Sequence, residues 1–105
     1  MVLLLSLLAC QTPAPTPGDL PRTGEVLETI NGQPFTQGTL DAVLTAMPPE
    51  AREQIEANNQ MPQLQEQLIT QEMLYQEALN RSLHTDAKVK TQIALAEREA
   101  LVAAL

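Results

Sequence analysis

Cys10 is the one cysteine of the 105-residue chain, and it stands directly behind the apolar run "VLLLSLLA" of residues 2–9. A single thiol forms no internal disulfide, and it is too few for a structural metal site, which takes about four ligands. The run is too short to cross a bilayer as a helix, because that takes roughly 20 residues. An apolar stretch of this length is typical of a signal peptide. The meaning of Cys10 therefore lies in its position.

The residues "LLAC" that end at Cys10 resemble the lipobox of bacterial lipoproteins. The resemblance implies that the Cys10 thiol accepts diacylglycerol and that cleavage makes Cys10 the new N-terminus. Residues 1–9 are then a lipoprotein signal peptide. No Lys or Arg precedes Cys10, so the positive n-region is missing and we expect the true start upstream of Met1. The alternative is a buried apolar segment with an incidental thiol.

The segment behind the cysteine, "QTPAPTPGDLP", is rich in proline and small polar residues. Such residues form no packed core and favour extended, solvated chain. We therefore expect residues 10–23 to be a disordered Pro-rich tether that holds a domain, residues 24–105, away from a membrane. Gln11 in place of Asp after the cysteine implies, by resemblance to enterobacterial sorting, the outer membrane if the source is Gram-negative. The expected location is the periplasmic or extracytoplasmic face.

The ionisable side chains predict no catalytic residue, no metal site and no cofactor. His84 is the only histidine, and with Ser82 nearby it makes neither a triad nor a ligand set, so a solvent-facing turn residue is expected. Glu97 and Glu99 stand two apart on a predicted helix and do not face each other. The chain itself is therefore predicted not to be an enzyme.

Three methionines, Met47, Met61 and Met73, are candidate contacts for a polypeptide client. Thioether side chains repack around varied apolar partners. These residues also fall near the apolar stripes of predicted helices, and plain packing in the core is the favoured alternative.

Composition favours a mainly α fold. Hydrophobic residues make up 44% of the chain but aromatic residues only 2%, so the core is built from aliphatic side chains, which suit helices. The net charge is −7, and an acidic surface repels phosphate backbones. Nucleic acid is therefore excluded as an expected partner.

One stretch, "EVLETINGQPFT", predicts a short β-hairpin before the helices. Val26, Thr29 and Ile30 favour a strand, and Asn31-Gly32 is a strong signal for a two-residue turn. Phe35 lies on the return strand. A two-stranded ribbon alone is marginal, so it needs helices to pack on.

Four helices are predicted after the hairpin. Thr36 caps the first, Pro48 ends it, and Pro49 suits the first turn of the second. Pro62 opens the longest helix, which carries apolar residues so widely spread, Leu68 and Leu74 among them, that we expect it to be covered from more than one side. Thr85 or Asp86 caps the last helix.

The last helix carries an apolar stripe at Val89, Ile93, Ala96 and Ala100. No Gly, Asn or Pro stops it before Leu105, so we expect that the domain is truncated within this element.

The order of these segments resembles the N-terminal chaperone region of SurA-like and PrsA-like periplasmic foldases. The segments are "TINGQPFTQGTLDAVL", "PPEAREQ" and "LQEQLITQEMLYQEALNRSLHTDAKV", of which "QLITQEMLYQEA" resembles the family pattern "LIxxxLLxxEA". The resemblance implies a SurA N-terminal-like helical domain, which usually precedes a parvulin-type peptidyl-prolyl isomerase domain. No segment of this chain resembles that histidine-bearing domain, so isomerase activity is not implied.

The leading hypothesis is a membrane-tethered chaperone-type domain that binds unfolded or exported polypeptides through an apolar helical surface. One alternative is the N-terminal fragment of a peptidyl-prolyl isomerase, for which a separate parvulin-domain protein is a candidate partner. Another is a structural envelope lipoprotein that binds one dedicated partner.

Overall fold

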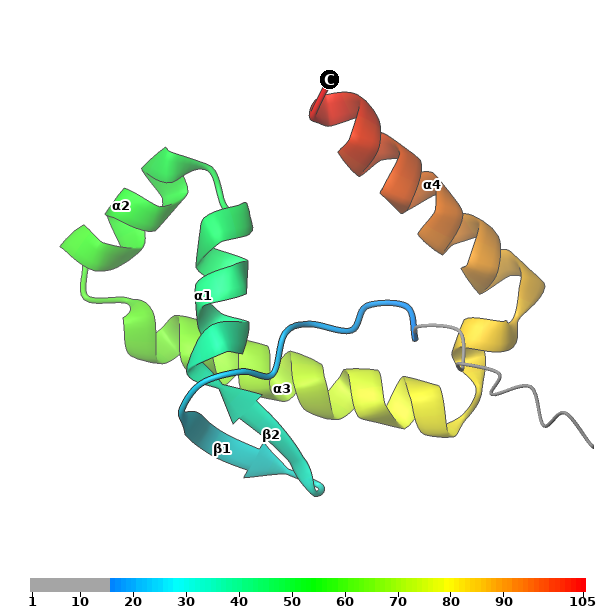
Figure 1. Ribbon diagram of the computed structural model, residues 1–105, viewed down its shortest axis with the longest axis horizontal. Helices are drawn as coiled ribbons and strands as arrows, with labels where there is room; N and C mark the ends of the chain where they lie inside the picture. The colour runs from blue at the N-terminus through cyan, green and yellow to red at the C-terminus, as the bar shows by residue number, and fades with distance from the viewer. Residues whose placement is uncertain (1–15) are drawn as a thin grey trace, which may run out of the picture.

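The computed structural model describes residues 16–105, so Cys10 and the predicted signal peptide lie outside the described residues. The described chain is a two-stranded hairpin followed by helices (Figure 1). The elements are β1 (Val26–Ile30), β2 (Gln33–Thr36), α1 (Gln37–Ala46), α2 (Pro49–Ala57), α3 (Met61–Asn80), the 3-10 turn η1 (Leu83–Thr85) and α4 (Ala87–Ala103). The predicted mainly helical class with a short hairpin is confirmed.

The hairpin forms where the sequence predicts it. Asn31 and Gly32 both adopt positive φ, at 50° and 80°, as a tight two-residue hairpin turn requires. The strands pair antiparallel with Ile30 opposite Gln33, and an irregularity interrupts the register between Val26 and Glu28. The ribbon packs against α1 and α3, which supplies the partner that two strands need for stability.

Thr36 begins α1 through a reciprocal cap. Its hydroxyl accepts a hydrogen bond from the Thr39 N–H at 3.3 Å, and the Thr39 hydroxyl accepts one from the Thr36 N–H at 3.4 Å. Both threonines are buried, at 1% and 4% exposure. The cap satisfies donors that the start of a helix leaves unpaired, and it confirms the predicted role of Thr36.

The prolines divide the next helices as expected. Pro49 occupies the first turn of α2, and Pro62 occupies the first turn of α3.

The fully buried apolar core is small and joins the hairpin to α1 and α3. It consists of Ile30, Phe35, Leu40 and Leu64, with Leu27, Leu44, Met47, Ile55, Met61, Leu68 and Ile69 packed around it.

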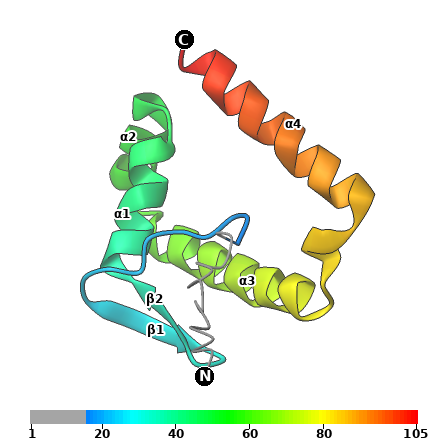
Figure 2. The ribbon, with the colours of Figure 1, turned by 45° about the vertical axis from the view of Figure 1, so that its right-hand side comes forward.

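The expectation that α3 is covered from more than one side is wrong for its second half. Leu68 packs against the core, but Leu74 is 67% exposed and Met73 is 51% exposed. The hairpin and α1 lie beside the first half of α3, and no other helix of the described chain covers its second half in either view (Figures 1 and 2). The apolar residues of α3 are therefore spread more widely around the helix than the surface that its neighbours cover.

The junction between α3 and α4 is set by local chemistry. Ser82 adopts the left-handed conformation at φ 56°, at the place where glycine would be more comfortable. The Asp86 carboxylate then accepts hydrogen bonds from the N–H groups of Lys88 and Val89, both at 3.1 Å, and so caps α4. Of the two predicted caps, Asp86 is therefore the one used.

Helix α4 packs mainly on η1. It rises away from α3 and leans back toward the side of α1 and α2, and its ribbon stays apart from theirs in both views (Figures 1 and 2). Within residues 16–105, no helix combines the length and the apolar character needed to cross a membrane.

Candidate functional site

Residues 16–23, which we call the strap, run across the domain although they belong to the predicted tether. Figure 1 shows this segment as a blue coil that passes over α1 and α3. Three of its backbone carbonyls accept hydrogen bonds from the helices. Pro17 accepts from the Tyr75 hydroxyl at 2.6 Å, Pro21 from the Thr39 hydroxyl at 2.6 Å, and Thr23 from the Gly38 N–H at 2.9 Å.

A charged contact fixes the strap a second time. The Arg22 guanidinium lies 2.6 Å from a Glu72 carboxylate oxygen on α3, and it also donates to the Pro34 carbonyl at 2.8 Å. The same carboxylate oxygen accepts from the Gln76 amide at 3.0 Å, and that amide also donates to the Ile30 carbonyl at 3.0 Å. The side chains of Arg22 and Glu72 are only 22% and 12% exposed. A charge-assisted bond in such shelter is stronger than an exposed ion pair.

Two glycines let the backbone come this close. Gly18 has φ 79°, and a Cβ there would lie 3.1 Å from Cε2 of the Tyr75 ring. A Cβ on Gly38 would overlap the carbonyl and the hydroxyl of Thr23. Each glycine therefore stands where the strap touches a helix.

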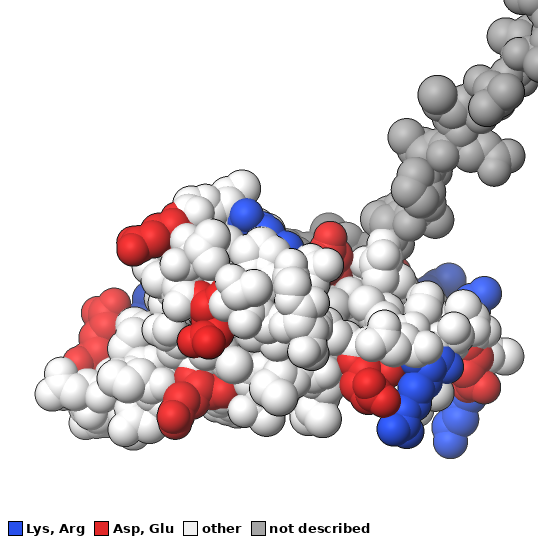
Figure 3. All heavy atoms as spheres, turned by 90° about the horizontal axis from the view of Figure 1, so that it is seen from below, with Lys and Arg blue, Asp and Glu red and all other residues white. Residues whose placement is uncertain are grey.

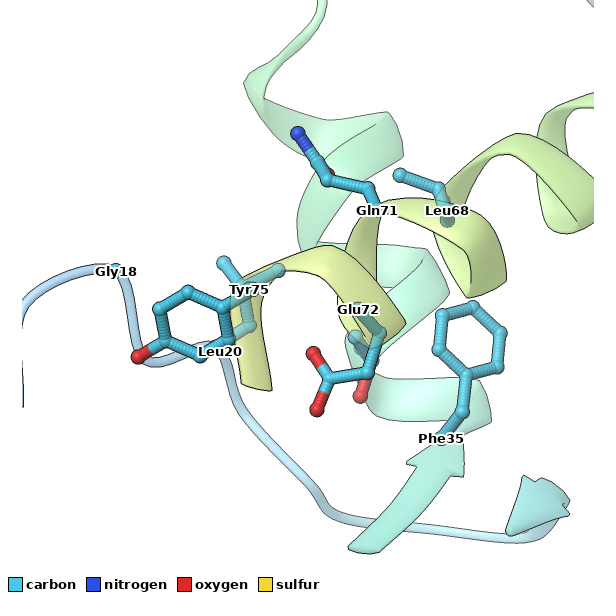
Figure 4. Close-up of a pocket in the computed structure, with 8 residues that line it drawn as sticks. Gly18, Leu20, Phe35, Leu68, Gln71, Glu72 and Tyr75 are labelled. Carbon is cyan, nitrogen blue, oxygen red and sulfur yellow. The ribbon is translucent and has the colours of Figure 1, made fainter. Parts of the chain in front are cut away.

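The strap does not fill the space beneath it. A pocket of about 320 Å³ remains, and we call it the Tyr75 groove. Strap residues form one wall, and β2, α1 and α3 form the rest (Figure 4). The lining residues are Gly18, Leu20, Phe35, Thr39, Leu68, Gln71, Glu72 and Tyr75.

The surroundings of Tyr75 raise the pKa of its hydroxyl above the ordinary tyrosine value. Burial raises the pKa of the Tyr75 hydroxyl, and the nearby carboxylates of Asp19 and Glu72 raise it further, while Arg22 lowers it. The Tyr75 hydroxyl therefore keeps its proton, and stays a hydrogen-bond donor, to a higher pH than an ordinary tyrosine.

The methionines proposed from the sequence do not meet at one exposed surface. Met47, at the end of α1, and Met61, at the start of α3, both pack against the core. Met73 is exposed on α3. Met61 also lines a shallow pocket with Ile69 and Glu28.

His84 lies in η1 and is half-buried rather than fully exposed. Its Nδ1 atom is enclosed, with no hydrogen-bond partner among the described residues. Within residues 16–105, no group of three or more His, Cys, Asp and Glu side chains is placed to hold a metal ion.

A second feature is the set of exposed apolar side chains on α4, Leu95, Leu101 and Val102, which we call the apolar surface of α4; Leu101 lies roughly 100–120° around the helix from the other two. These side chains are 56%, 73% and 71% exposed. Leu95 and Val102 stand seven residues apart and so share one side of the helix, opposite to the predicted stripe that contains Val89. The sequence pattern does not single out this side, because the regular apolar stripe of α4 runs along the other one.

The strap was missed for a different reason. The strap is rich in proline, which is typical of a solvated tether, and no residue close to it in the sequence indicates that it contacts the helices. Two residues could have indicated a contact: Tyr75, one of only two aromatic residues, and Thr39, a second threonine close to the Thr36 cap.

Comparisons of the chain with protein-family models, with characterised proteins and with solved structures find no match.

Proposed function

We propose that this protein is a lipid-anchored chaperone-type domain on the extracytoplasmic face of a membrane, and that it binds apolar segments of unfolded or exported polypeptides. The observation that carries this proposal is the exposure of Leu95, Leu101 and Val102 on α4, a helix that packs mainly on η1. Exposed apolar residues on an ordered helix offer surface to a partner.

The physical basis is apolar burial without a fixed sequence requirement. Covering apolar surface is worth about 25 cal/mol per Å², and the gain has no directional component. Unfolded polypeptides expose apolar segments of many sequences, so such a surface binds them broadly. Leu74 and Met73 on α3 add exposed apolar area outside α4.

The anchor is part of the same proposal. Acylation of Cys10 through the lipobox-like "LLAC" would hold the domain at a membrane, where exported chains emerge unfolded. The expected site is the periplasmic side of the outer membrane in a Gram-negative source.

The experiment is an aggregation assay on the full chain, with light scattering of several denatured clients as the readout. The Leu101→Ser, Val102→Ser double variant changes the α4 surface without touching the core. We expect it to lose most of the suppression that the wild type gives. A Glu97→Gln, Arg98→Gln variant of the same helix is the matched control and should behave as the wild type.

Equal suppression by the wild type and by the Leu101→Ser, Val102→Ser variant would contradict the assignment of α4 as the binding surface. In a protease-coupled proline isomerisation assay, we expect only the background rate. A rate above background would instead favour the isomerase alternative.

A second candidate is a structural envelope lipoprotein with one dedicated partner. The ordered, largely unburied α4 favours it as well, because one helix face can fit one partner helix. Failure of the wild type to suppress aggregation of any client would select this candidate over the chaperone.

A further inference from the structure

The strap contacts follow one chemical rule. Tyr75, Thr39 and Gly38 all donate hydrogen bonds, and the strap supplies only backbone carbonyls to them. The one cation of the strap, Arg22, meets the carboxylate of Glu72. The helices thus present three hydrogen-bond donors to the carbonyls of the strap and one carboxylate to its cation.

These donors suit a polypeptide segment that contains prolines. Proline has no backbone N–H, so a proline segment needs donors opposite its carbonyls and leaves few donors of its own unpaired. Prolines also hold the chain extended before binding, which lowers the entropy lost on docking. Two of the three accepted carbonyls belong to prolines, Pro17 and Pro21.

The groove also has room that the strap leaves empty. The open volume is about 320 Å³, and Leu20, which lines it, remains 40% exposed. A segment with a larger apolar side chain at the place of Leu20 would fill more of this volume and cover more of Leu68, which is only partly buried. The strap is therefore an incomplete match to its own groove.

We propose that the Tyr75 groove is a binding site for extended, proline-containing polypeptide segments that carry a basic residue, with the strap as its resident occupant. An incoming segment displaces the strap and takes over its contacts with Tyr75, Thr39 and Glu72. This site is separate from the apolar surface of α4, and it does not depend on the function proposed for that surface.

The resident occupant sets the affinity that an external segment shows. A tethered competitor acts at an effective concentration in the millimolar range, so the intact strap weakens binding of an external peptide. Arg22→Gln removes the strap cation and leaves every helix residue of the groove in place. Gly18→Ala disturbs the strap independently, because alanine is strained at φ 79° and its Cβ crowds the Tyr75 ring.

The experiment measures peptide binding to the full chain by fluorescence anisotropy. The probe is a labelled peptide of residues 13–23, "PAPTPGDLPRT", and the control peptide carries Pro17→Ala, Pro21→Ala and Arg22→Glu. We expect the probe to bind the Arg22→Gln and Gly18→Ala proteins about tenfold more tightly than the wild type, as release of a tethered competitor predicts. The control peptide should bind all three proteins weakly.

A double variant, Arg22→Gln with Tyr75→Phe, tests whether the Tyr75 hydroxyl donates a hydrogen bond to a carbonyl of the bound peptide, as it does to the Pro17 carbonyl of the strap. It keeps the ring and removes one hydrogen bond, so we expect about a fivefold loss of probe affinity relative to Arg22→Gln alone. Thermal melts establish that each variant is folded.

Two outcomes would overturn the proposal: equal binding of probe and control peptides, or equal probe affinity in the wild type and both strap variants. The Leu101→Ser, Val102→Ser protein should bind the probe like the wild type. Failure at the groove and failure at α4 are therefore distinguishable.

Discussion

Tyr75 connects more parts of the domain than its single hydrogen bond implies. Its hydroxyl holds the Pro17 carbonyl, its ring lies against Gly18, and its side chain lines the groove beneath the strap (Figure 4). Because it is the only tyrosine, and tryptophan is absent from the sequence, its absorbance and fluorescence report this one place.

The raised pKa of Tyr75 predicts an alkaline loss of stability. Burial favours the neutral form in the folded chain, so the folded state binds the proton more tightly than the unfolded state. Stability from this group is present below the ordinary tyrosine pKa of about 10 and falls as pH rises through the folded pKa. Urea midpoints measured across this range should fall for the wild type and less for Tyr75→Phe. Parallel curves for both proteins would contradict the assignment.

Cys10 carries a prediction that concerns the membrane. If two or three acyl chains are attached, each buried CH₂ contributes about 0.8 kcal/mol and the protein is firmly anchored. Cys10→Ser should move the protein from the membrane fraction to the soluble fraction. Cys10→Ala is a second variant with the same expected result. A free thiol at Cys10 in the mass spectrum of the wild type would exclude the anchor.

Among the elements, α3 organises the domain, because the core and the strap both meet it. Its Leu64 is 9% exposed in the core, whereas Leu74, ten residues later on the same helix, is 67% exposed. Two of its polar side chains, Glu72 and Gln76, reach the strap and the hairpin. One helix thus serves as a core element on one side and as an open surface on another.

This division predicts unequal effects of the same substitution. Leu64→Ala should lower the free energy of unfolding by about 2 to 5 kcal/mol, because it leaves a cavity in a small core. Leu74→Ala is the matched control and should change it by less than about 0.5 kcal/mol. Chemical denaturation of both variants provides the measurement. A large effect at Leu74 would mean that another surface covers it in solution.

At the scale of the whole molecule, charge is unevenly distributed. Residues 16–86 carry a net charge of −8, whereas α4 carries +1. Figure 3 shows acidic side chains spread over the α2 side, with most of the visible Lys and Arg at the opposite end. The acidic body agrees with the choice of a basic residue in the proposed ligand of the Tyr75 groove, since opposite charges attract.

The separate position of α4 predicts unequal protection from hydrogen exchange. Helix α4 packs mainly on η1, so its amides should open at low free-energy cost, whereas α1 and the first half of α3 open only with the core. Exchange followed by mass spectrometry should show α4 exchanging faster. Equal protection of α4 and α3 would indicate that another surface covers α4.

The features that the sequence determined alone are those set by neighbouring residues. The Asn31-Gly32 turn and the Thr36 start of α1 each follow from the conformational preference or hydrogen bonds of a few adjacent residues. The start of α4 was narrowed in the same way to Thr85 or Asp86, and the structure uses Asp86. The helical class follows in the same way from aliphatic composition and spacing.

Only the tertiary structure decided what joins distant parts of the chain. The contact of Tyr75 with Pro17 spans 58 residues, and that of Arg22 with Glu72 spans 50. Local preference cannot encode such pairs, because the same proline segment is equally compatible with solvent. Exposure of Leu74 was undecidable for a related reason: a helical pattern marks which residues share a side, but the size of the partner determines how much of that side is covered.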